Sequence, residues 1–165
     1  GSKVPSHRVE QRFGVRKVSS AIDEDLRRGR VFSVNGRRVF IRGANFIIPD
    51  GMLRFDAERC RREVLYHAHM GLNCLRLWGG SNMATPALLD ACDELGVMVW
   101  YEFWVTGDCM GRGATPQSPV SFSGWPLDHD LFLRSAADCI RWVRNHLSVL
   151  LWCGGNEQRP APDLR

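Results

Sequence analysis

Short apolar segments alternate with helix-length amphipathic segments along most of this chain, and this alternation constrains the fold more than any other feature. The apolar segments have the length of buried strands and lie at residues 39–41, 72–77, 97–101 and 149–153. A strand–helix–strand repeat of this kind gives parallel strands joined by crossover helices. The sequence therefore predicts an α/β fold with four parallel strands and three helices between them.

The first two expected helices begin at residues that can cap them. Asp56 and Thr85 carry side-chain oxygens suited to an N-cap, and Pro86 fits the first helical position. The third helix is expected to start near Asp128. Apolar side chains then recur at helical spacing, namely Cys60, Val64 and Ala68, then Leu88, Cys92 and Leu95, then Phe132, Ala136, Cys139 and Val143. A glycine, the usual residue at a helix end, follows each of the first two helices.

Two architectures fit this alternation, a doubly wound sheet and a (β/α) barrel. Neither a Gly-x-Gly-x-x-Gly motif nor a P-loop follows any expected strand, so nucleotide binding has no support. Polar, charged and aromatic residues gather instead at the C-terminal ends of the expected strands, namely Arg42, Asn45, Arg76, Trp78, Glu102, Trp104, Asn156 and Glu157. In a barrel, this end of the strands carries the active site.

Composition excludes several classes of partner. The 165 residues suffice for one domain, and the net charge of +4 is spread without a basic run longer than two, which argues against nucleic acid. The apolar run at 149–153 is far shorter than the roughly 20 residues that span a bilayer. The six cysteines show neither Cys-x-x-Cys pairs nor metal-ligand spacing, so we expect buried free thiols, no metal site and no cofactor.

The two ends of the chain and one long loop complete the organisation. The chain starts Gly-Ser-Lys-Val-Pro, without an initiating methionine or the apolar region of a signal peptide, so we expect it to begin within a longer protein. Residues 106–127 form a polar loop rich in glycine, proline and serine. Loops of this length are often functional.

Glu157 is the candidate catalytic residue. Glycoside hydrolysis needs one carboxyl group that protonates the leaving oxygen and a second carboxyl group on the other side of the sugar. Glu157 follows the last expected strand through two glycines and Asn156, whose amide can hydrogen-bond a hydroxyl beside the cleaved bond. An ordinary solvent-exposed loop glutamate also fits this spacing.

Arg76 is a charged residue in an otherwise apolar strand, and it therefore needs a partner. Glu102, at the end of the next strand, can be that partner, either in a purely structural ion pair or in a charge network that orients sugar hydroxyls. Trp78 precedes two glycines and is either a stacking floor for a sugar or a core residue.

Several of these segments together resemble the catalytic barrel of glycoside hydrolase family 2. The resemblance is carried by residues 72–76, by residues 92–100 (Cys-Asp-Glu-Leu-Gly-Val-Met-Val-Trp), and by Arg144-Asn145-His146-Leu147-Ser148 through Asn156-Glu157. Upstream, residues 32–36 and 40–43 match the start of that barrel, and residues 13–16 resemble the last strand of the immunoglobulin-like domain before it. The motifs occur in the family's order and span nearly the whole chain.

The resemblance implies a domain organisation and a set of site residues. Residues 17–165 would form the first half of a (β/α)8 TIM barrel, and residues 1–16 the end of an immunoglobulin-like β-sandwich. Glu157 would be the acid/base of a retaining hydrolase. The expected substrate-binding residues are Asn156, Arg76, Trp78, Glu102, Trp104 and Asp50.

The family takes its nucleophile from a later strand, beyond position 165. The resemblance therefore implies that this chain alone is inactive, with the rest of the barrel coming from the same or another polypeptide.

The sequence Trp-Gly-Gly after Arg76 resembles the β-mannosidase branch of the family. Residues 45–54, 102–108, 111–113, 124–131 and 155–158 are more similar still to its plant-type endo-acting branch, which cuts the mannose-β-1,4-GlcNAc bond of N-glycans. That resemblance implies an oligosaccharide or glycopeptide substrate, and a vacuolar or other intracellular compartment. An exo-β-mannosidase and a non-catalytic, carbohydrate-binding half-barrel remain the alternatives.

Overall fold

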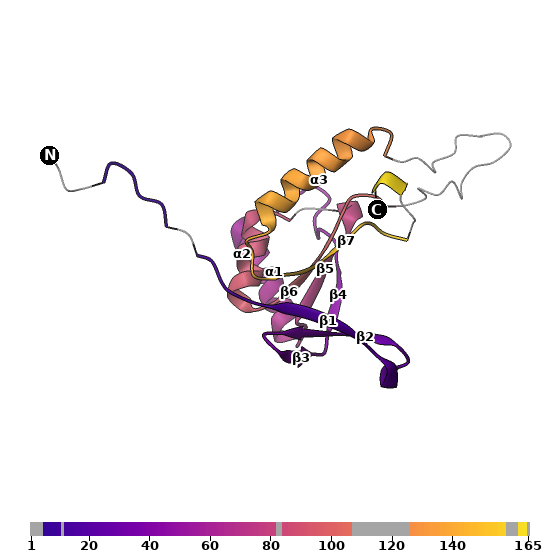
Figure 1. Cartoon of the computed structure of the whole chain (residues 1–165). Coiled ribbons are helices and arrows are strands. Elements are labelled where there is room, and N and C mark those ends of the chain that lie inside the picture. The colour runs from indigo at the N-terminus through magenta and orange to yellow at the C-terminus, as the bar shows by residue number, and fades with distance from the viewer. Residues whose placement is uncertain (1–4, 11, 82–83, 107–125, 158–161, 165) are drawn as a thin grey trace.

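The computed structural model describes residues 5–10, 12–81, 84–106, 126–157 and 162–164. These residues build a parallel sheet with helices packed on it, and a small antiparallel sheet at one end (Figure 1). The N-terminal segment runs away from this body as extended chain. No helix within the described ranges is long and apolar enough to cross a bilayer.

The parallel sheet has the strand order β4-β5-β6-β7. Its strands are β4 (Gly43–Phe46), β5 (Cys74–Leu77), β6 (Met98–Glu102) and β7 (Val149–Cys153). The helices between them are α1 (Ala57–His69), α2 (Pro86–Leu95) and α3 (His129–Val143). The predicted set of four parallel strands and three crossover helices is therefore confirmed.

The helix starts follow from local hydrogen bonds, as the sequence predicts. The side chain of Asp56 accepts from the N–H of Arg59 at 2.8 Å, and the side chain of Asp128 accepts from the N–H of Leu131 at 2.8 Å. Thr85 caps α2 in the same way, with Pro86 directly after it. Each cap satisfies a backbone donor that the helix leaves unpaired.

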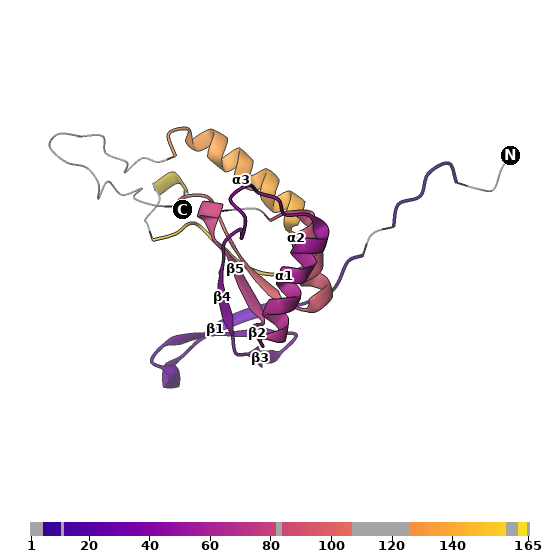
Figure 2. The same cartoon turned by 180° about the vertical axis from the view of Figure 1, so that it is seen from behind.

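All three helices lie on one face of the parallel sheet in both views (Figure 1, Figure 2). One apolar cluster joins strand residues such as Leu75 and Tyr101 to Val64 of α1, Leu89 of α2 and Val143 of α3. Burying a leucine completely contributes roughly 1.5–3 kcal/mol, so this cluster fixes which face the helices cover. A doubly wound sheet carries helices on both faces, so the structure favours the barrel over that alternative.

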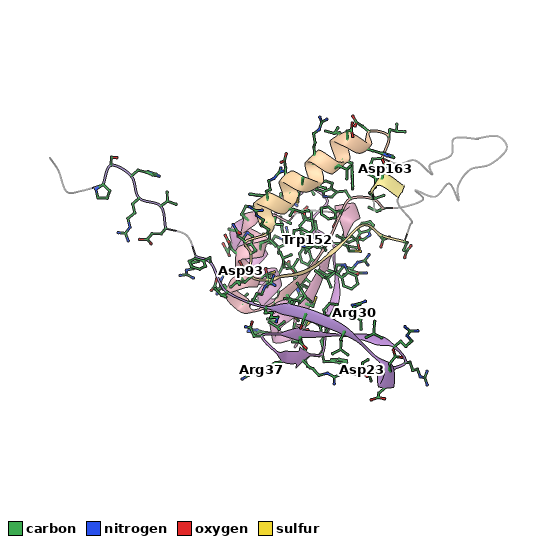
Figure 3. The ribbon with its side chains drawn as sticks, viewed as in Figure 1. Asp23, Arg30, Arg37, Asp93, Trp152 and Asp163 are labelled. Atoms are coloured by element: carbon green, nitrogen blue, oxygen red, sulfur yellow. The ribbon has the colours of Figure 1, made fainter. Side chains whose placement is uncertain are left out.

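Helix α3 is less deeply packed than its predicted apolar stripe implies. Of its predicted stripe, Ala136 and Val143 are buried, whereas Phe132 and Cys139 are only partly buried. Cys139 Sγ lies 2.7 Å from the hydroxyl of Tyr101. Figure 3 shows side chains filling the space between the sheet and α3, with Trp152 of β7 among them. The Trp152 ring stacks at 15° on the Phe103 ring, with centroids 5.8 Å apart.

The prediction of a first barrel strand at 39–41 is wrong. Val39 ends an antiparallel strand, residues 40–42 belong to no strand, and β4 begins at Gly43. The side chain of Asn73 occupies this stretch, since its Oδ1 accepts from the N–H of Arg42 at 2.8 Å and its Nδ2 donates to the carbonyl of Phe40 at 2.9 Å. Arg42 therefore lies before β4, at the edge opposite the predicted site, where its Nε donates to the carbonyl of Gly71 at 2.8 Å.

An antiparallel sheet precedes the barrel strands, and the sequence analysis did not predict it. It consists of β1 (Val18–Asp23), β2 (Gly29–Val34) and β3 (Arg37–Val39), in that order. Asn35 and Gly36 close the β2–β3 hairpin with φ of 51° and 78°, which is the type I′ conformation that the sequence Asn-Gly favours. Asp23 and Arg37 lie on this sheet, away from the helices (Figure 3).

The described residues before β1 contain no helix or strand. The guanidinium of Arg16 donates to the carbonyls of Leu147 and Val149, which fixes the end of this segment beside the start of β7. The immunoglobulin-like assignment of residues 1–16 stays a prediction. Most of the polar loop expected at 106–127 lies outside the described residues.

Candidate functional site

Arg76 of β5 is the centre of a polar network at the carboxyl edge of the parallel sheet. Side chains alternate between the two faces of a strand, so Arg76 points away from the helices that cover its neighbours Leu75 and Leu77. The strand register places Asn45 of β4 and Trp100 of β6 directly beside it. The face opposite the helices therefore carries the polar groups.

Glu102 is the main partner of Arg76. Its Oε2 accepts from Arg76 Nε at 2.8 Å and from Arg76 Nη2 at 2.5 Å, and its Oε1 accepts from the backbone N–H of Gly79 at 3.0 Å. The Glu102 side chain is fully buried, and that of Arg76 is 24% exposed. A buried carboxylate is tolerated when such partners compensate its lost hydration. The predicted Arg76–Glu102 ion pair is therefore confirmed.

Two asparagines complete the network. Arg76 Nη1 donates to Asn45 Oδ1 at 3.1 Å, and Arg76 Nη2 donates to Asn156 Oδ1 at 2.6 Å. The four strand ends that the sequence places at one edge therefore meet around a single guanidinium. Asn45 was expected at this edge from the sequence, which indicated no role for it.

Trp100 and Gly79 are the members of the site that the sequence analysis missed. The guanidinium carbon of Arg76 lies 5.8 Å from the centroid of the Trp100 ring, within cation–π range. A side chain at Gly79 would place its Cβ 2.2 Å from the carbonyl oxygen of Phe103, so only glycine fits there. The Gly-Gly pair after Trp78 was a usable signal for this close approach. No local pattern marked Trp100.

Trp78 and Trp104 lie at the same edge but point to different surroundings. A Cβ added to Gly80 would lie 2.3 Å from the Trp78 indole, so this ring folds over its own loop. Trp104 follows β6 and meets the Phe132 ring of α3 edge-on, with centroids 6.0 Å apart. Both residues are partly exposed, which leaves each with surface for a ligand.

Glu157 follows Asn156 directly, just beyond β7, with an exposed side chain. The loop is fixed to the end of β6, because the N–H of Asn156 donates to the carbonyl of Val105 at 2.9 Å and the N–H of Phe103 donates to the carbonyl of Cys153 at 2.9 Å. Glu157 has a φ of 52°, in the left-handed region that residues other than glycine seldom adopt. Residues held in that region often belong to functional sites.

Asp50 lies in the loop after β4 and is surrounded by donors. Its carboxylate accepts from Arg54 Nε at 2.8 Å, from Arg59 Nη1 at 3.0 Å and from the N–H of Met52 at 2.9 Å. These hydrogen bonds, first of all the one from Arg54, lower the pKa of Asp50 to about 2. The carboxylate is therefore charged at neutral pH and already has three partners.

We expect the Asp50 ion pairs to stabilise the fold only above acidic pH. The pKa of Asp50 is about 2 in the folded state and ~3.9 in an unfolded chain, so the folded state binds fewer protons between these values. The difference in unfolding temperature between the wild type and Asp50→Asn should be constant down to about pH 4 and should shrink as the pH falls through about 2. Calorimetric scans across this range measure it. Arg54→Gln should reduce the same dependence, and a difference that grows on acidification would contradict the assignment.

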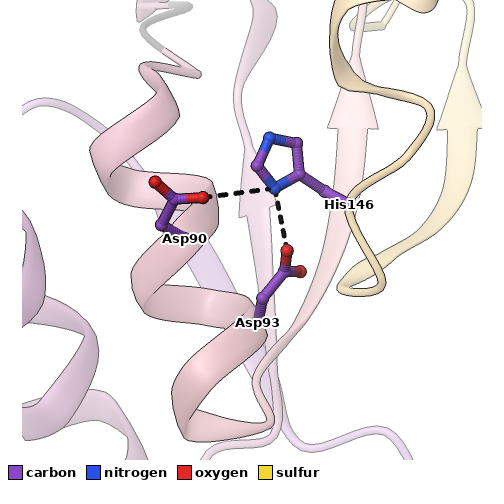
Figure 4. A group of neighbouring side chains, drawn as sticks. All are labelled: Asp90, Asp93 and His146. Atoms are coloured by element: carbon purple, nitrogen blue, oxygen red, sulfur yellow. Dashed lines mark hydrogen bonds and ion pairs between the residues drawn. The ribbon is translucent and has the colours of Figure 1, made fainter. Parts of the chain in front are cut away.

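A second group of titratable side chains lies at the opposite edge of the sheet (Figure 4). Asp93 of α2 accepts from His146 Nδ1 at 2.8 Å and from the N–H of Ser148 at 2.7 Å, and Asp90 lies 3.8 Å from the same imidazole nitrogen. Aspartate and histidine can hold a cation, but both oxygens of Asp93 already accept hydrogen bonds. These bonds tie α2 to the turn before β7, so the group acts as a structural clamp.

Cys60 and Cys92 are buried in the apolar core and are unsuited to act as nucleophiles. All five cysteines within the described residues are free, as predicted, but only Cys60, Cys74 and Cys92 are buried, and Cys109 lies outside those residues. Burial raises the pKa of the Cys60 thiol and raises that of the Cys92 thiol to about 12. A thiol must lose its proton to attack, so these side chains are inert packing groups.

The amino-acid sequence of the chain is similar to the sequences of glycosidases. The model of "Glycosyl hydrolases family 2, TIM barrel domain" matches residues 26–165. The chain is 50% identical over 153 residues to mannosylglycoprotein endo-beta-mannosidase of Lilium longiflorum, covering 93% of this chain and 16% of that protein. It is 32% identical over 154 residues to beta-mannosidase B of Aspergillus fumigatus, covering 92% of this chain and 17% of that protein.

A solved structure supports the same relationship. The crystal structure of beta-D-mannosidase from Dictyoglomus thermophilum superposes with a TM-score of 0.70 at 32% identity, over 90% of this chain and 17% of that chain. The chain thus spans about a sixth of the length of the relatives that it matches.

Proposed function

Because the chain belongs to glycoside hydrolase family 2, we propose that it forms part of the catalytic barrel of a retaining β-mannosidase in which Glu157 is the acid/base. The observation that carries the proposal is the Arg76 network, which holds Asn156 at the carboxyl edge of the barrel strands immediately before Glu157. The named relatives at 50% and 32% identity are both β-mannosidases, which supports β-mannosides as the substrate class.

In this proposal the strand ends bind one sugar and expose its glycosidic bond to Glu157. The Asn156 amide donates to the hydroxyl beside the cleaved bond, while Trp78 and Trp104 offer aromatic faces on which a sugar ring can stack. Glu157 first protonates the leaving oxygen and then activates the water that hydrolyses the glycosyl–enzyme intermediate. Asp50 lies in the loop after β4, and we assign it to substrate binding through Arg54, whose exposed guanidinium it holds at 2.8 Å and which can donate to a further hydroxyl.

The finer substrate that we propose is the mannose-β-1,4-GlcNAc bond of N-glycans. It rests on the 50% identity with the Lilium protein, whose name states that it is an endo-β-mannosidase of mannosylglycoproteins. An exo-β-mannosidase is the second candidate, since the Dictyoglomus structure, with a TM-score of 0.70, is named a beta-D-mannosidase without mention of endo action. A carbohydrate-binding half-barrel without catalysis is the third candidate.

Activity on a matched set of substrates tests the proposal. The complete enzyme that carries this chain should release product from an aryl β-mannoside, and much less from the corresponding β-galactoside and β-glucuronide. An N-glycan core whose β-mannose bears α-mannosyl branches separates the candidates. An endo-acting enzyme releases the branched oligosaccharide whole, whereas an exo-acting enzyme requires the branches to be removed first. A complete enzyme that binds but never cleaves these substrates would leave only the carbohydrate-binding function.

A further inference from the structure

Glu102 lies beneath the sugar site without being accessible from it. We infer that Glu102 is a positioning residue, which fixes Arg76 and thereby turns the amide groups of Asn45 and Asn156 toward the substrate. This inference rests on the proposed function and assigns Glu102 a role other than direct contact with the sugar.

The burial of Glu102 separates it from any ligand. Its side chain is fully buried, and its two oxygens accept three hydrogen bonds from Arg76 and Gly79. A sugar hydroxyl could reach the carboxylate only by displacing one of these donors. Displacing Arg76 would leave a charge in the interior without its partner, which is strongly unfavourable.

The guanidinium of Arg76 connects Glu102 to the two asparagines. Its five N–H donors lie in one rigid plane, so fixing Nε and one Nη2 hydrogen on Glu102 also fixes the directions of the others. Two of the remaining N–H groups, on Nη1 and Nη2, donate to the side-chain oxygens of Asn45 and Asn156. The guanidinium has donors only, so each amide must turn its oxygen toward Arg76.

This arrangement defines what the asparagines offer to a ligand. Because the oxygen of Asn156 is held by Arg76 at 2.6 Å, its NH₂ group is the part directed elsewhere. A sugar hydroxyl beside the cleaved bond can then accept from that NH₂ group. Without Glu102, Arg76 could rotate, and the Asn156 amide could flip to present an acceptor where the substrate needs a donor.

Gly79 fixes the other oxygen of Glu102. Its N–H donates to Oε1 at 3.0 Å, and the chain passes so close to Phe103 that no side chain fits at this position. Both oxygens of the Glu102 carboxylate are therefore held, one by Arg76 of β5 and the other by the loop after β5. A preorganised group of this kind keeps the amides in place before substrate binds.

A double-mutant cycle in the complete enzyme tests the inference. Glu102→Gln and Asn156→Ala should each lower kcat/KM on an aryl β-mannoside by about 100-fold, the cost of a misplaced substrate-positioning group. The double variant should lose little more than either single variant, because both changes remove the same oriented amide. Losses that multiply in the double variant would overturn the inference, since Glu102 would then act independently of Asn156.

A substrate lacking one hydroxyl separates positioning from general damage to the fold. In the wild type, the 2-deoxy aryl β-mannoside should bind and react worse than the normal substrate. We take the ratio of kcat/KM on the normal substrate to kcat/KM on the 2-deoxy substrate. In Glu102→Gln this ratio should fall from its wild-type value toward its value in Asn156→Ala. An unchanged ratio would mean that Glu102 is merely structural. Asp93→Asn, which breaks the clamp at the opposite edge, should lower the unfolding temperature and leave the ratio unchanged.

Three further measurements keep the outcome decisive. If Glu102→Gln does not fold, Glu102→Asp retains the charge, shifts Arg76 and should change the substrate ratio in the same direction. If the wild type cleaves another aryl β-glycoside but no β-mannoside, the proposed function fails, and the cycle is measured on the substrate that is cleaved. If it cleaves no aryl β-glycoside, the affinities of the wild type, the two single variants and the double variant for D-mannose are measured by calorimetric titration. Losses of binding free energy that add up in the double variant would again overturn the inference.

Discussion

Replacing Glu157 by alanine in the complete enzyme should lower kcat/KM by about 10²- to 10⁴-fold on a β-mannoside with a poor leaving group, the usual contribution of a general acid. A substrate with an activated leaving group, such as a dinitrophenolate, needs little protonation. Its glycosylation step should therefore be much less affected, although hydrolysis of the intermediate still slows without a base. Steady-state rates on a series of aryl β-mannosides of decreasing leaving-group pKa measure the difference.

The response of the Glu157→Ala variant to added azide is a second test of the acid/base role. The small anion can attack the glycosyl–enzyme intermediate without a general base, so it should restore turnover on activated substrates and yield β-mannosyl azide. Glu94→Ala is the matched control, because Glu94 is an exposed glutamate paired with Arg61 of α1, outside the site. The control should retain full activity and form no azide product. Equal losses on all leaving groups, without the azide product, would show that Glu157 is a binding or structural residue.

The 165-residue chain on its own should show no turnover on β-mannosides. A retaining mechanism needs a second carboxylate as nucleophile, and family resemblance places it on a later strand. At the carboxyl edge, the carboxylates of Asp50 and Glu102 are both held by arginines, so neither is available to attack a sugar. Removing one member of a catalytic group can cost about 10⁶-fold in rate, which puts the isolated chain below detection.

The comparison needs the complete enzyme at the same molar concentration, with circular dichroism to show that the isolated chain has folded. Adding the rest of the barrel as a separate polypeptide should restore activity if the two parts associate. Cleavage by the folded chain alone, abolished by Glu157→Gln, would show that the prediction is wrong. A substitute nucleophile would then have to lie within these residues.

The sequence alone determined the features of this protein that depend on a few neighbouring residues. Asp56 and Thr85 cap their helices as predicted, and the third helix starts at Asp128 as expected, because an N-cap bond joins residues only two or three positions apart. The parallel direction of the strands also followed from the alternation, since a crossover helix returns the chain in the same direction. These rules placed Arg76 and Glu157 at one edge before any contact was known.

Predictions from local sequence patterns were wrong where the antiparallel sheet meets the parallel sheet. The apolar run that includes Phe40 has the composition of a buried strand, yet Phe40 is 80% exposed, and the Asn73 side chain bonds the Phe40 carbonyl and the Arg42 N–H in place of a neighbouring strand. The antiparallel sheet before it was missed for a different reason. Its pairing depends on register between strands, and composition alone does not set that register.

Only the tertiary structure decided how the site is connected. Arg76 bonds residues 26, 31 and 80 positions away in the chain, and no periodicity within a segment relates such positions. The choice between a barrel and a doubly wound sheet also needed the tertiary structure. All three helices pack on one face of the sheet, and this depends on contacts between side chains across the core. The sequence therefore specified which groups reach the carboxyl edge, and the strand register decided which of them hold one another there.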